Sequence, residues 1–503
     1  MANSSSKPLQ SANSRVYIID GRARGDHKPS YESCLRMTGL SQGYGDVERV
    51  ECPDPYQYGK FIEVATIRGA TDRPTTTIEG RYPIDLLSTL LALARKGCTF
   101  DVQLHMGDCT DPSVFNDYKK VLVLESAYLT NFGTDDLGAL ASGDNAVVNE
   151  NADLSGKDAY ELRPLAVGAA AASIVTVEVL DVVICDTIQC GDCGEQSDGC
   201  ERVYALTTAA GGSPGTPADI VFSIDKGVSW AAHDIDTLAT AEVPDELDCI
   251  GSYIVVVANA TDSIHYALKS EFDGFTDPTW TEIATGIVAA GSPNAIHSTG
   301  GHAFIVGDGG YVYETEDPTT GVTVLSAGSV VTDNLVAVHS LSSTMAVATG
   351  ANGAVIYTLD GSAWSAATRP VGVGVTLRAV WMKSEFEWWV GSSTGNLYYT
   401  LNKGETWTLK AFPGSAAGRV DAIEFATDSV AYIAHATATP RGRVLRSVDG
   451  GYSWVVLPEG TGSMPLNDRI NAIAVCKNDP NFFVGVGLGD DATDGIIVVG
   501  EAS

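Results

Sequence analysis

Three eight-residue segments in the second half of the chain share one pattern of Ser or Thr, Asp or Asn, Gly and Trp. They read Ser223-Ile-Asp225-Lys-Gly227-Val-Ser-Trp230, Thr400-Leu-Asn402-Lys-Gly404-Glu-Thr-Trp407 and Ser447-Val-Asp449-Gly-Gly451-Tyr-Ser-Trp454, with a shortened copy at Thr358-Leu-Asp360-Gly-Ser-Ala-Trp364. The pattern predicts a turn between two strands, in which the Asp or Asn side chain accepts backbone N–H bonds and Gly takes a positive φ. The Trp should open the next strand and fill the gap between neighbouring sheets.

The segments recur at a spacing that is typical of a propeller. With eroded copies around 270–280 and 315–324, the tryptophans at 230, 280, 364, 407 and 454 are roughly 45 residues apart, which is the length of a four-stranded blade. Seven units begin near 203, 247, 293, 334, 376, 419 and 469. The last unit lacks an outer strand and the first lacks an inner one, so we expect a strand from one end to complete the sheet at the other. Six or eight blades remain open alternatives.

These segments resemble the Asp-box (BNR) repeat of β-propellers. The resemblance covers residues 202–503 and implies an all-β ring that serves as a binding or display surface. The second half of the chain also resembles the photosystem II assembly-factor type of propeller, which is a binding module for an assembly partner. A propeller of this kind can alternatively bind glycans. Asp225, Asp360 and Asp449 are then expected to be turn residues rather than catalytic acids.

Sialidases also contain Asp-box propellers, so a glycoside hydrolase is a further alternative. Their chemistry needs an arginine cluster for the substrate carboxylate, a Tyr–Glu nucleophile pair and an acid Asp. The arginines of the second half are scattered in sequence, at positions 202, 369, 378, 419, 441, 443, 446 and 469, and the Arg-Ile-Pro opening of that family is absent. Abundant carboxylates alone do not make an acid–base pair. We therefore expect no enzymatic activity and no catalytic residues.

The first part of the chain does not repeat. After a polar tail over residues 1–14, strand-like runs occur at 16–20, 61–67, 75–79, 100–104, 121–124 and 161–165, and leucine periodicity predicts one helix over 84–96, stopped by Gly97. The order of 73–80, helix and 100–104, followed by 126–133 and 146–150, is similar to the β-sandwich with one helix of bacteriophage tail tube proteins. We therefore assign residues 15–184 to a β-sandwich or barrel-type, tail-tube-like domain.

The tail-tube resemblance implies a self-associating protein. Subunits of that family form hexameric rings whose strands join between neighbours, and the rings stack into a tube, which removes exposed sheet edges. The expected function is that of a major tail tube subunit carrying the propeller outside the tube. The expected partners are other copies of the chain, other virion proteins and cell-surface glycans, and the expected location is the virion after synthesis in the host cytoplasm.

A cysteine-rich hinge over residues 185–201 precedes the repeats. It contains Cys185, Cys190, Cys193 and Cys200 among several glycines. Four thiolates at this spacing can bind zinc, can form two disulfides that attach the linker to the first blade, or can stay free. All three interpretations are structural, and no other cofactor is expected, because the eight histidines do not cluster at metal-ligand spacing.

The charge of the chain limits the classes of partner that it can bind. The formal net charge is -32 and the pI is about 4.4, with most of the excess acid in residues 185–503. Such a surface repels nucleic acid and anionic membranes, so sequence-specific nucleic-acid binding is not expected. No secretory signal and no apolar run long enough to span a bilayer are predicted, so no membrane partner is expected.

Overall fold

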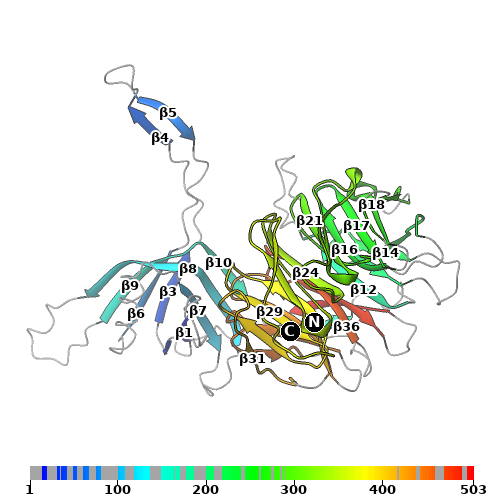
Figure 1. Cartoon of the computed structure of the whole chain (residues 1–503). Coiled ribbons are helices and arrows are strands. Elements are labelled where there is room, and N and C mark those ends of the chain that lie inside the picture. Colours follow the sequence, from blue (N-terminus) through cyan, green and yellow to red (C-terminus); the bar gives the residue numbers. More distant parts are fainter. Residues whose placement is uncertain are drawn as a thin grey trace, which may run out of the picture. The chain divides into compact units, whose positions relative to one another are not determined.

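The computed structural model describes the chain as two units of β-structure (Figure 1). The described residues are 14–19, 31–33, 36–41, 49–53, 61–66, 75–80, 100–107, 118–135, 149–163, 165–169, 177–185, 200–208, 218–238, 244–259, 262–272, 277–283, 286–288, 290–415, 418–437, 442–458, 469–489 and 495–502. The chain divides into two compact units, Met1–Pro164 and Leu165–Ser503. Each unit is described by itself below.

The first unit contains an eight-stranded antiparallel sheet in the order β2-β1-β7-β8-β9-β6-β3, with β10 pairing β8. The strands are β1 (Ser14–Ile19), β2 (Tyr31–Ser33), β3 (Arg36–Ser41), β6 (Thr75–Gly80), β7 (Phe100–Gly107), β8 (Tyr118–Asp135), β9 (Asn149–Ser155) and β10 (Asp158–Leu162). A separate hairpin pairs β4 (Arg49–Pro53) with β5 (Phe61–Thr66).

The long strand β8 joins two halves of this sheet. Its first part pairs with β7 and β10, and its second part pairs with β9. The change of partner falls at Ser126, which has a φ of 48° and donates its N–H to Asp101 Oδ1 at 2.8 Å. A left-handed residue in mid-strand bends the chain, so β8 can belong to both halves. Most of the predicted strands of this part are confirmed, whereas the helix predicted over 84–96 lies outside the described residues.

The second unit consists of four-stranded antiparallel sheets. The first four sheets are β12 (Val179–Ile184), β13 (Val203–Thr207), β14 (Asp219–Ser223) and β15 (Ala231–Asp234); β16 (Pro244–Ile250), β17 (Tyr253–Ala258), β18 (Ser263–Leu268) and β19 (Thr281–Glu282); β20 (Pro293–Thr299), β21 (His302–Gly307), β22 (Tyr311–Thr315) and β23 (Thr323–Ala327); and β24 (Leu335–Ser342), β25 (Met345–Gly350), β26 (Val355–Thr358) and β27 (Trp364–Ala366).

Three more sheets follow in the same pattern. They are β28 (Leu377–Met382), β29 (Trp388–Ser392), β30 (Leu397–Thr400) and β31 (Thr408–Lys410); β32 (Arg419–Phe425), β33 (Ala431–Ala436), β34 (Gly442–Ser447) and β35 (Val455–Val456); and β36 (Arg469–Val475), β37 (Phe483–Leu488) and β38 (Gly495–Ala502), joined by β11 (Leu165–Ala169). Short 3-10 turns occur at Lys269–Glu271, Asp308–Gly310, Pro318–Thr320 and Ala351–Gly353. Among the described residues no helix has the length and apolar character needed to cross a bilayer.

The sheets are arranged as a closed ring. The first strand of each sheet contacts the first strand of the next, in the order β12, β16, β20, β24, β28, β32 and β36, and β36 contacts β12 in turn. In Figure 1 the labels β12, β16, β24 and β36 gather near the middle of the unit. Apolar side chains fill the gaps between neighbouring sheets; one such cluster holds Tyr204, Phe222, Phe272 and Trp280.

The ring closes where its two ends meet in one sheet. β11, which precedes the first complete sheet, pairs with β38 at the carboxyl end of the chain and becomes the outermost strand of the last sheet. This pairing agrees with the complementary deficits of the first and last repeat units. The division after Pro164 differs from the domain boundary predicted at residue 184, because β11 and β12 read as strands without a repeat motif but lie in the sheets of the ring.

Every first strand carries one extra residue at an equivalent position. The register of the first and second strands skips between Val179 and Asp181, Pro244 and Glu246, Pro293 and Ala295, Leu335 and Ala337, Leu377 and Ala379, Val420 and Ala422, and Ile470 and Ala472. Glycines such as Gly350 and Gly487 lie opposite these bulges, where a Cβ would collide with the carbonyl of Asn334 or Arg469. A β-bulge redirects the side chain of its extra residue.

Two disulfides fasten the first complete sheet to both of its neighbours. Cys185 at the end of β12 is bonded to Cys249 in β16, with 6.1 Å between their Cα atoms. Cys200 before β13 is bonded to Cys476 after β36, with 5.8 Å between Cα atoms. Of the alternatives left open for the hinge cysteines, Cys185 and Cys200 are in disulfides, and both have partners far away in sequence. Cys190 and Cys193 lie outside the described residues.

The disulfide at the closure of the ring should be the more stabilising of the two. Cys200 and Cys476 are separated by 276 residues and Cys185 and Cys249 by 64. In the chain-entropy description, a longer loop stabilises by about 1 kcal/mol more, within a usual total of about 2–4 kcal/mol. We expect the pair Cys200→Ser and Cys476→Ser to lower the free energy of unfolding more than the pair Cys185→Ser and Cys249→Ser, as measured by denaturant unfolding. An equal or reversed loss would contradict this.

Candidate functional site

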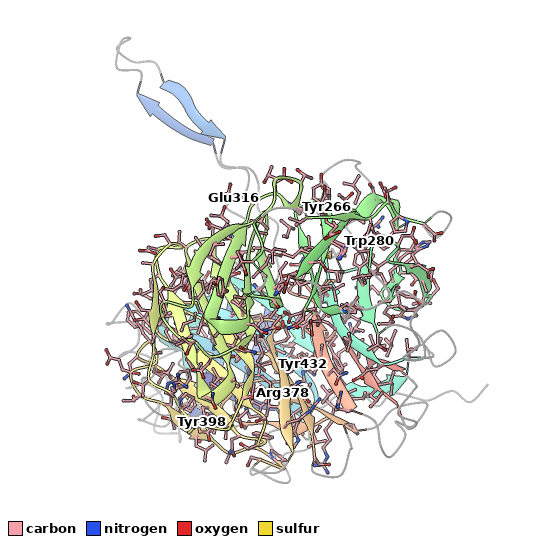
Figure 2. All side chains as sticks on the ribbon, turned by 45° about the vertical axis from the view of Figure 1, so that its right-hand side comes forward. Tyr266, Trp280, Glu316, Arg378, Tyr398 and Tyr432 are labelled. Carbon is pink, nitrogen blue, oxygen red and sulfur yellow. A yellow bond between two sulfur atoms is a disulfide. The ribbon has the colours of Figure 1, made fainter. Side chains whose placement is uncertain are left out.

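The first strands of the sheets surround a central cavity with a volume of about 690 Å³. Its wall includes residues from β12, β16, β20, β24, β28, β32 and β36. Figure 2 labels Arg378 of β28 near the middle of the ring and Tyr398 of β30 closer to its rim. Because this cavity collects polar side chains from every sheet, we take it as the candidate functional site and call it the channel.

Side chains of one strand bind the backbone of the next strand around the channel. The N–H groups of Leu247, Ile296 and Ser298 donate to Asp181, Glu246 and Asp248 at 3.0, 2.6 and 2.5 Å. A first strand has a ladder partner on one side only, so its other N–H groups need acceptors from elsewhere. The carboxylates therefore have a structural role, which is to connect neighbouring sheets along the channel wall.

The acidic side of the channel resists ionisation. Burial raises the pKa of Asp181 to about 7, and repulsion from Asp248 and Glu424 adds to the effect of burial. Burial likewise raises the pKa of Asp248 to about 6 and of Glu424 to about 7, and that of Glu246 well above its ordinary value. These carboxyl groups come from three sheets, and because they are buried, with neighbouring carboxyls adding repulsion at Asp181, Glu246 and Glu424, each holds its proton to a higher pH than a free carboxyl.

Two neutral imidazoles adjoin the acidic groups. The rings of His297 and His339 lie 4.2 Å apart, and His339 lies 3.8 Å from Trp381. Burial lowers the pKa of His297 to about 3, and that of His339 well below its ordinary value. Nδ1 of His297 accepts the N–H of Ser340 and Nδ1 of His339 accepts the N–H of Met382, at 3.1 and 3.2 Å. Both rings thus continue the pattern of strand-to-strand contacts in uncharged form.

Three arginines meet at the end of the channel where the first strands begin. Arg378 Nε and Arg419 Nε donate to Asp421 Oδ1 and Oδ2 at 2.8 and 2.7 Å, and Arg469 Nε donates to Asn471 Oδ1 at 2.7 Å. Asn471 and Arg469 in turn donate to Glu178 Oε1 at 2.9 and 2.5 Å. We call these six residues (Arg378, Asp421, Arg419, Asn471, Arg469 and Glu178) the arginine belt.

The predicted turn residues lie at equivalent places between the third and fourth strands of their sheets. Ser223, Thr358, Thr400 and Ser447 end β14, β26, β30 and β34, and Trp230, Trp364, Trp407 and Trp454 open or directly precede β15, β27, β31 and β35. The glycines at 227, 361, 404 and 451 have φ between 75° and 92°. The hydroxyls of Ser223 and Ser447 accept the N–H of Gly227 and Gly451, each at 2.8 Å.

The acidic residue of the turn makes the same contacts in two copies with different burial. Oδ1 of Asp225 accepts the N–H of Ser229 at 2.8 Å, and Oδ1 of Asp449 accepts the N–H of Ser453 at 2.8 Å. Asp449 is only 2% exposed, and burial raises its pKa despite these bonds. In the third copy Asn402 Oδ1 accepts the N–H of Thr406 at 3.0 Å. These residues hold turns and are not among the residues that line the channel.

The channel residues were missed by reasoning from the sequence, although a signal for them exists. The extra residue of each bulge is followed by Ala and then Ile or Val in five first strands, at Asn294-Ala-Ile, Val336-Ala-Val, Arg378-Ala-Val, Asp421-Ala-Ile and Asn471-Ala-Ile. Alignment of the repeats on this tripeptide, rather than on the tryptophans, would have placed Arg378, Asp421 and Asn471 at one level. The scattered arginines of the sequence are thus brought together by the ring.

Of the four hinge cysteines, only Cys190 and Cys193 can still be zinc ligands, and both lie outside the described residues. Cys185 and Cys200 are bonded to other cysteines, so they do not provide thiolates for zinc. Within the described ranges, no three His, Cys, Asp or Glu side chains are close enough to hold a metal ion.

A closed ring of four-stranded antiparallel sheets around a channel defines a β-propeller, so the predicted mainly-β propeller architecture is confirmed. Comparison with solved structures finds YCF48 bound to D1 peptide, with a TM-score of 0.49 and 16% identity over 67% of this chain and 95% of that one. YCF48 from Cyanidioschyzon merolae gives 0.49 and 14% over 66% and 98%, and a chain of the mitotic checkpoint complex gives 0.45 and 10% over 68% and 92%. At these values the fold rests on the strand pairing of the chain itself.

No protein-family model matches the chain, and no curated protein matches it in sequence.

The raised carboxyl pKa values predict that the ring loses stability as the pH rises. Folded Asp181 binds its proton more tightly than the unfolded chain does, so its contribution falls between pH 3.8 and about 7. In Asp181→Asn the amide oxygen can still accept the N–H of Leu247, but no charge forms. We expect this variant to gain about 1–4 kcal/mol at pH 8 and little at pH 4, since one pKa unit corresponds to about 1.4 kcal/mol. The measurement is denaturant unfolding at both values.

The matched control for this experiment is Asp225→Asn. Burial would raise the pKa of Asp225, but hydrogen bonds from Ser229 and Ser223 outweigh burial and lower it. This control should therefore show no gain at pH 8. A gain of similar size in both variants would show that the effect does not come from the channel.

The different burial of Asp225 and Asp449 predicts different losses of stability when each side chain is truncated to Ala. Asp449→Ala leaves the buried hydroxyl of Ser447 and the partly buried N–H of Ser453 without an acceptor, whereas water can replace the carboxylate of the exposed turn in Asp225→Ala. We expect a loss of about 2–3 kcal/mol for the first variant and about 1 kcal/mol or less for the second. Thermal unfolding of both variants checks this, and equal losses would refute the difference in burial as the cause.

Proposed function

We propose that the protein is a structural component of a phage virion, a tail tube subunit whose propeller is carried on the outside of the tube. The observation that carries this proposal is the closure of the ring. Because β11 and β38 are neighbours in the last sheet, the propeller begins and ends at one place. Only Arg163 and Pro164 separate β10 from β11. A ring attached in this way can be added to a tube-forming domain without interrupting the strands of that domain.

We propose seven blades for the propeller. The described residues contribute seven four-stranded sheets, and their first strands form one closed circuit. In this arrangement the repeat unit that begins near 203 supplies the later strands of the first sheet, which β12 completes. The units near 247, 293, 334, 376 and 419 each supply all four strands of a sheet, and the unit near 469 is completed by β11.

The first unit has features that support self-association. In the described part of its sheet, β2 and β3 are the end strands and offer backbone groups for pairing with another chain. The hairpin of β4 and β5 pairs only with itself among the described strands. Together with the resemblance to tail tube proteins, these edges support a β-sandwich that joins copies into a ring, with six subunits as in that family, and rings that stack. Virion location and contacts with other virion proteins follow from this proposal.

A binding module is the second candidate function, and the channel favours it. A cavity of about 690 Å³ that carries polar and charged groups from several sheets has the size of a ligand pocket, which is usually about 300–1,000 Å³. Its ligand would be a glycan of the cell surface or an assembly partner. Hydrolysis is not proposed, because the channel carboxyls Asp181, Glu246 and Asp248 accept backbone N–H groups and serve as structural acceptors.

Self-assembly is the test of the virion proposal. We expect the full chain, purified under oxidising conditions and concentrated, to form rings or stacked tubes with peripheral knobs in negative-stain electron microscopy, and to sediment as an oligomer. Rings or tubes should still form in the Cys200→Ser, Cys476→Ser variant at ambient temperature, because assembly is assigned to the first unit and both cysteines lie in the second. A chain that remains monomeric at high concentration would count decisively against a tube subunit and would leave the binding module as the better account.

A further inference from the structure

The arginine belt holds its guanidinium groups in place by one edge only. Arg378 and Arg419 each bind the buried carboxylate of Asp421 through Nε, and the side chain of Asp421 is 2% exposed. The side chains of Arg378, Arg419 and Arg469 are 41%, 25% and 29% exposed. The anchoring atoms are thus inside the wall while the outer parts of the guanidinium groups reach solvent.

Donors on these arginines are left over after the contacts of the belt are made. A guanidinium has five N–H donors in a planar fork. Arg378 uses Nε alone, and neither of its Nη atoms has a partner among the described residues. Arg419 adds one long contact from Nη2 to Asn471 Oδ1 at 3.4 Å, and Arg469 adds Nη2 to Glu178. The free donors of three consecutive sheets therefore adjoin one another at one end of the channel.

The belt also carries an excess of positive charge. Three guanidinium groups are balanced by only two carboxylates, those of Asp421 and Glu178. Burial, together with repulsion from Arg378 and Arg469, lowers the pKa of Arg419. An added anion would relieve this repulsion, in a chain whose overall charge is -32.

We propose that the arginine belt binds the carboxylate group of a ligand at this end of the channel. A carboxylate is planar and accepts two parallel N–H bonds, which matches the fork of a guanidinium. It also carries a single negative charge, which equals the excess of the belt, whereas a phosphate dianion would exceed it. The carboxylate belongs either to the end or side chain of a peptide or to an acidic sugar, which share this chemistry.

A structural purpose alone does not account for the arrangement. Asp421 needs one arginine to be paired, and Arg419 from its own strand already supplies it. Arg378 comes from the preceding sheet and is the most exposed of the three arginines of the belt. Neither of its Nη atoms has a partner among the described residues. Removal of Arg378 leaves the pair of Asp421 and Arg419 in place, so this residue can be tested with little effect on folding.

The test is ligand-detected saturation-transfer NMR on the full oxidised chain at low salt, where ion pairs are least screened. N-acetylglycine is compared with its neutral amide, and methyl glucuronoside is compared with methyl glucoside. The variants are Arg378→Gln, Arg378→Lys and, as the matched control, Arg369→Gln, because Arg369 is 40% exposed and pairs with Asp333 outside the belt. Thermal unfolding monitors the fold of each variant.

We expect both carboxylates to bind and both neutral partners to give no signal. Affinity should fall at least tenfold in Arg378→Gln, should fall several-fold in Arg378→Lys, which keeps the charge and loses the fork, and should be unchanged in Arg369→Gln. The tighter of the two carboxylates then identifies the source. If Arg378→Gln does not fold, the Lys variant decides.

Three results would overturn the proposal. One is equal binding of carboxylates and neutral partners or no binding of either, and another is unchanged affinity in both Arg378 variants. The third is stronger binding of inorganic phosphate than of either carboxylate, which would indicate a general attraction of anions. None of these results depends on whether the chain assembles into tubes.

Discussion

The pairing of β11 with β38 is the contact on which the ring depends. Each sheet of a propeller contacts only its two neighbours, so a ring with an open end would leave one sheet without its outer strand and two apolar faces in water. The chain avoids this by using the segment just after the first unit to complete the last sheet. The disulfide between Cys200 and Cys476 then joins the first complete sheet to that same last sheet. Closure is thus made twice, by a strand and by a covalent bond.

Closure also creates the channel and its chemistry. The first strands face a space that no further strand can enter, and their free N–H groups must find acceptors among side chains. On one side these acceptors are carboxyl groups that come close enough to repel one another, and on another they are neutral imidazoles. At one end the bulges redirect Arg378, Asp421 and Asn471 into a common network. The contacts that connect the sheets and the polar groups that could bind a ligand therefore both lie along the inner edge of the first strands.

The two units suit a division of labour. Among its described strands, the first unit has two end strands and a separate hairpin, and the second unit has a polar cavity and a closed ring of sheets. The short connection at Arg163 and Pro164 lets the ring be a self-contained addition. Under the proposed function, assembly belongs to the first unit and recognition to the second.

The sequence by itself determined the local elements of the ring. Ser223, Asp225, Gly227 and Trp230 specify their turn through side-chain hydrogen bonds and a positive φ, which are interactions within a few residues. Because these interactions are local, the turns and the approximate period could be predicted. The partners of the hinge cysteines and the start of the ring at β11 could not be predicted for the opposite reason, since Cys200 has its partner 276 residues away and β11 pairs with β38.

The tertiary structure alone decided the channel. Arg378, Arg419 and Arg469 lie at the start of β28, β32 and β36. The bulge tripeptide aligns Arg378 with Asp421 and Asn471, but only the arrangement of the three strands around the axis brings the three arginines to one end of the channel. The same holds for Asp181, Glu246 and Glu424, whose pKa values depend on burial and on charges from other sheets. Such properties depend on the distances between sheets, which local sequence does not encode.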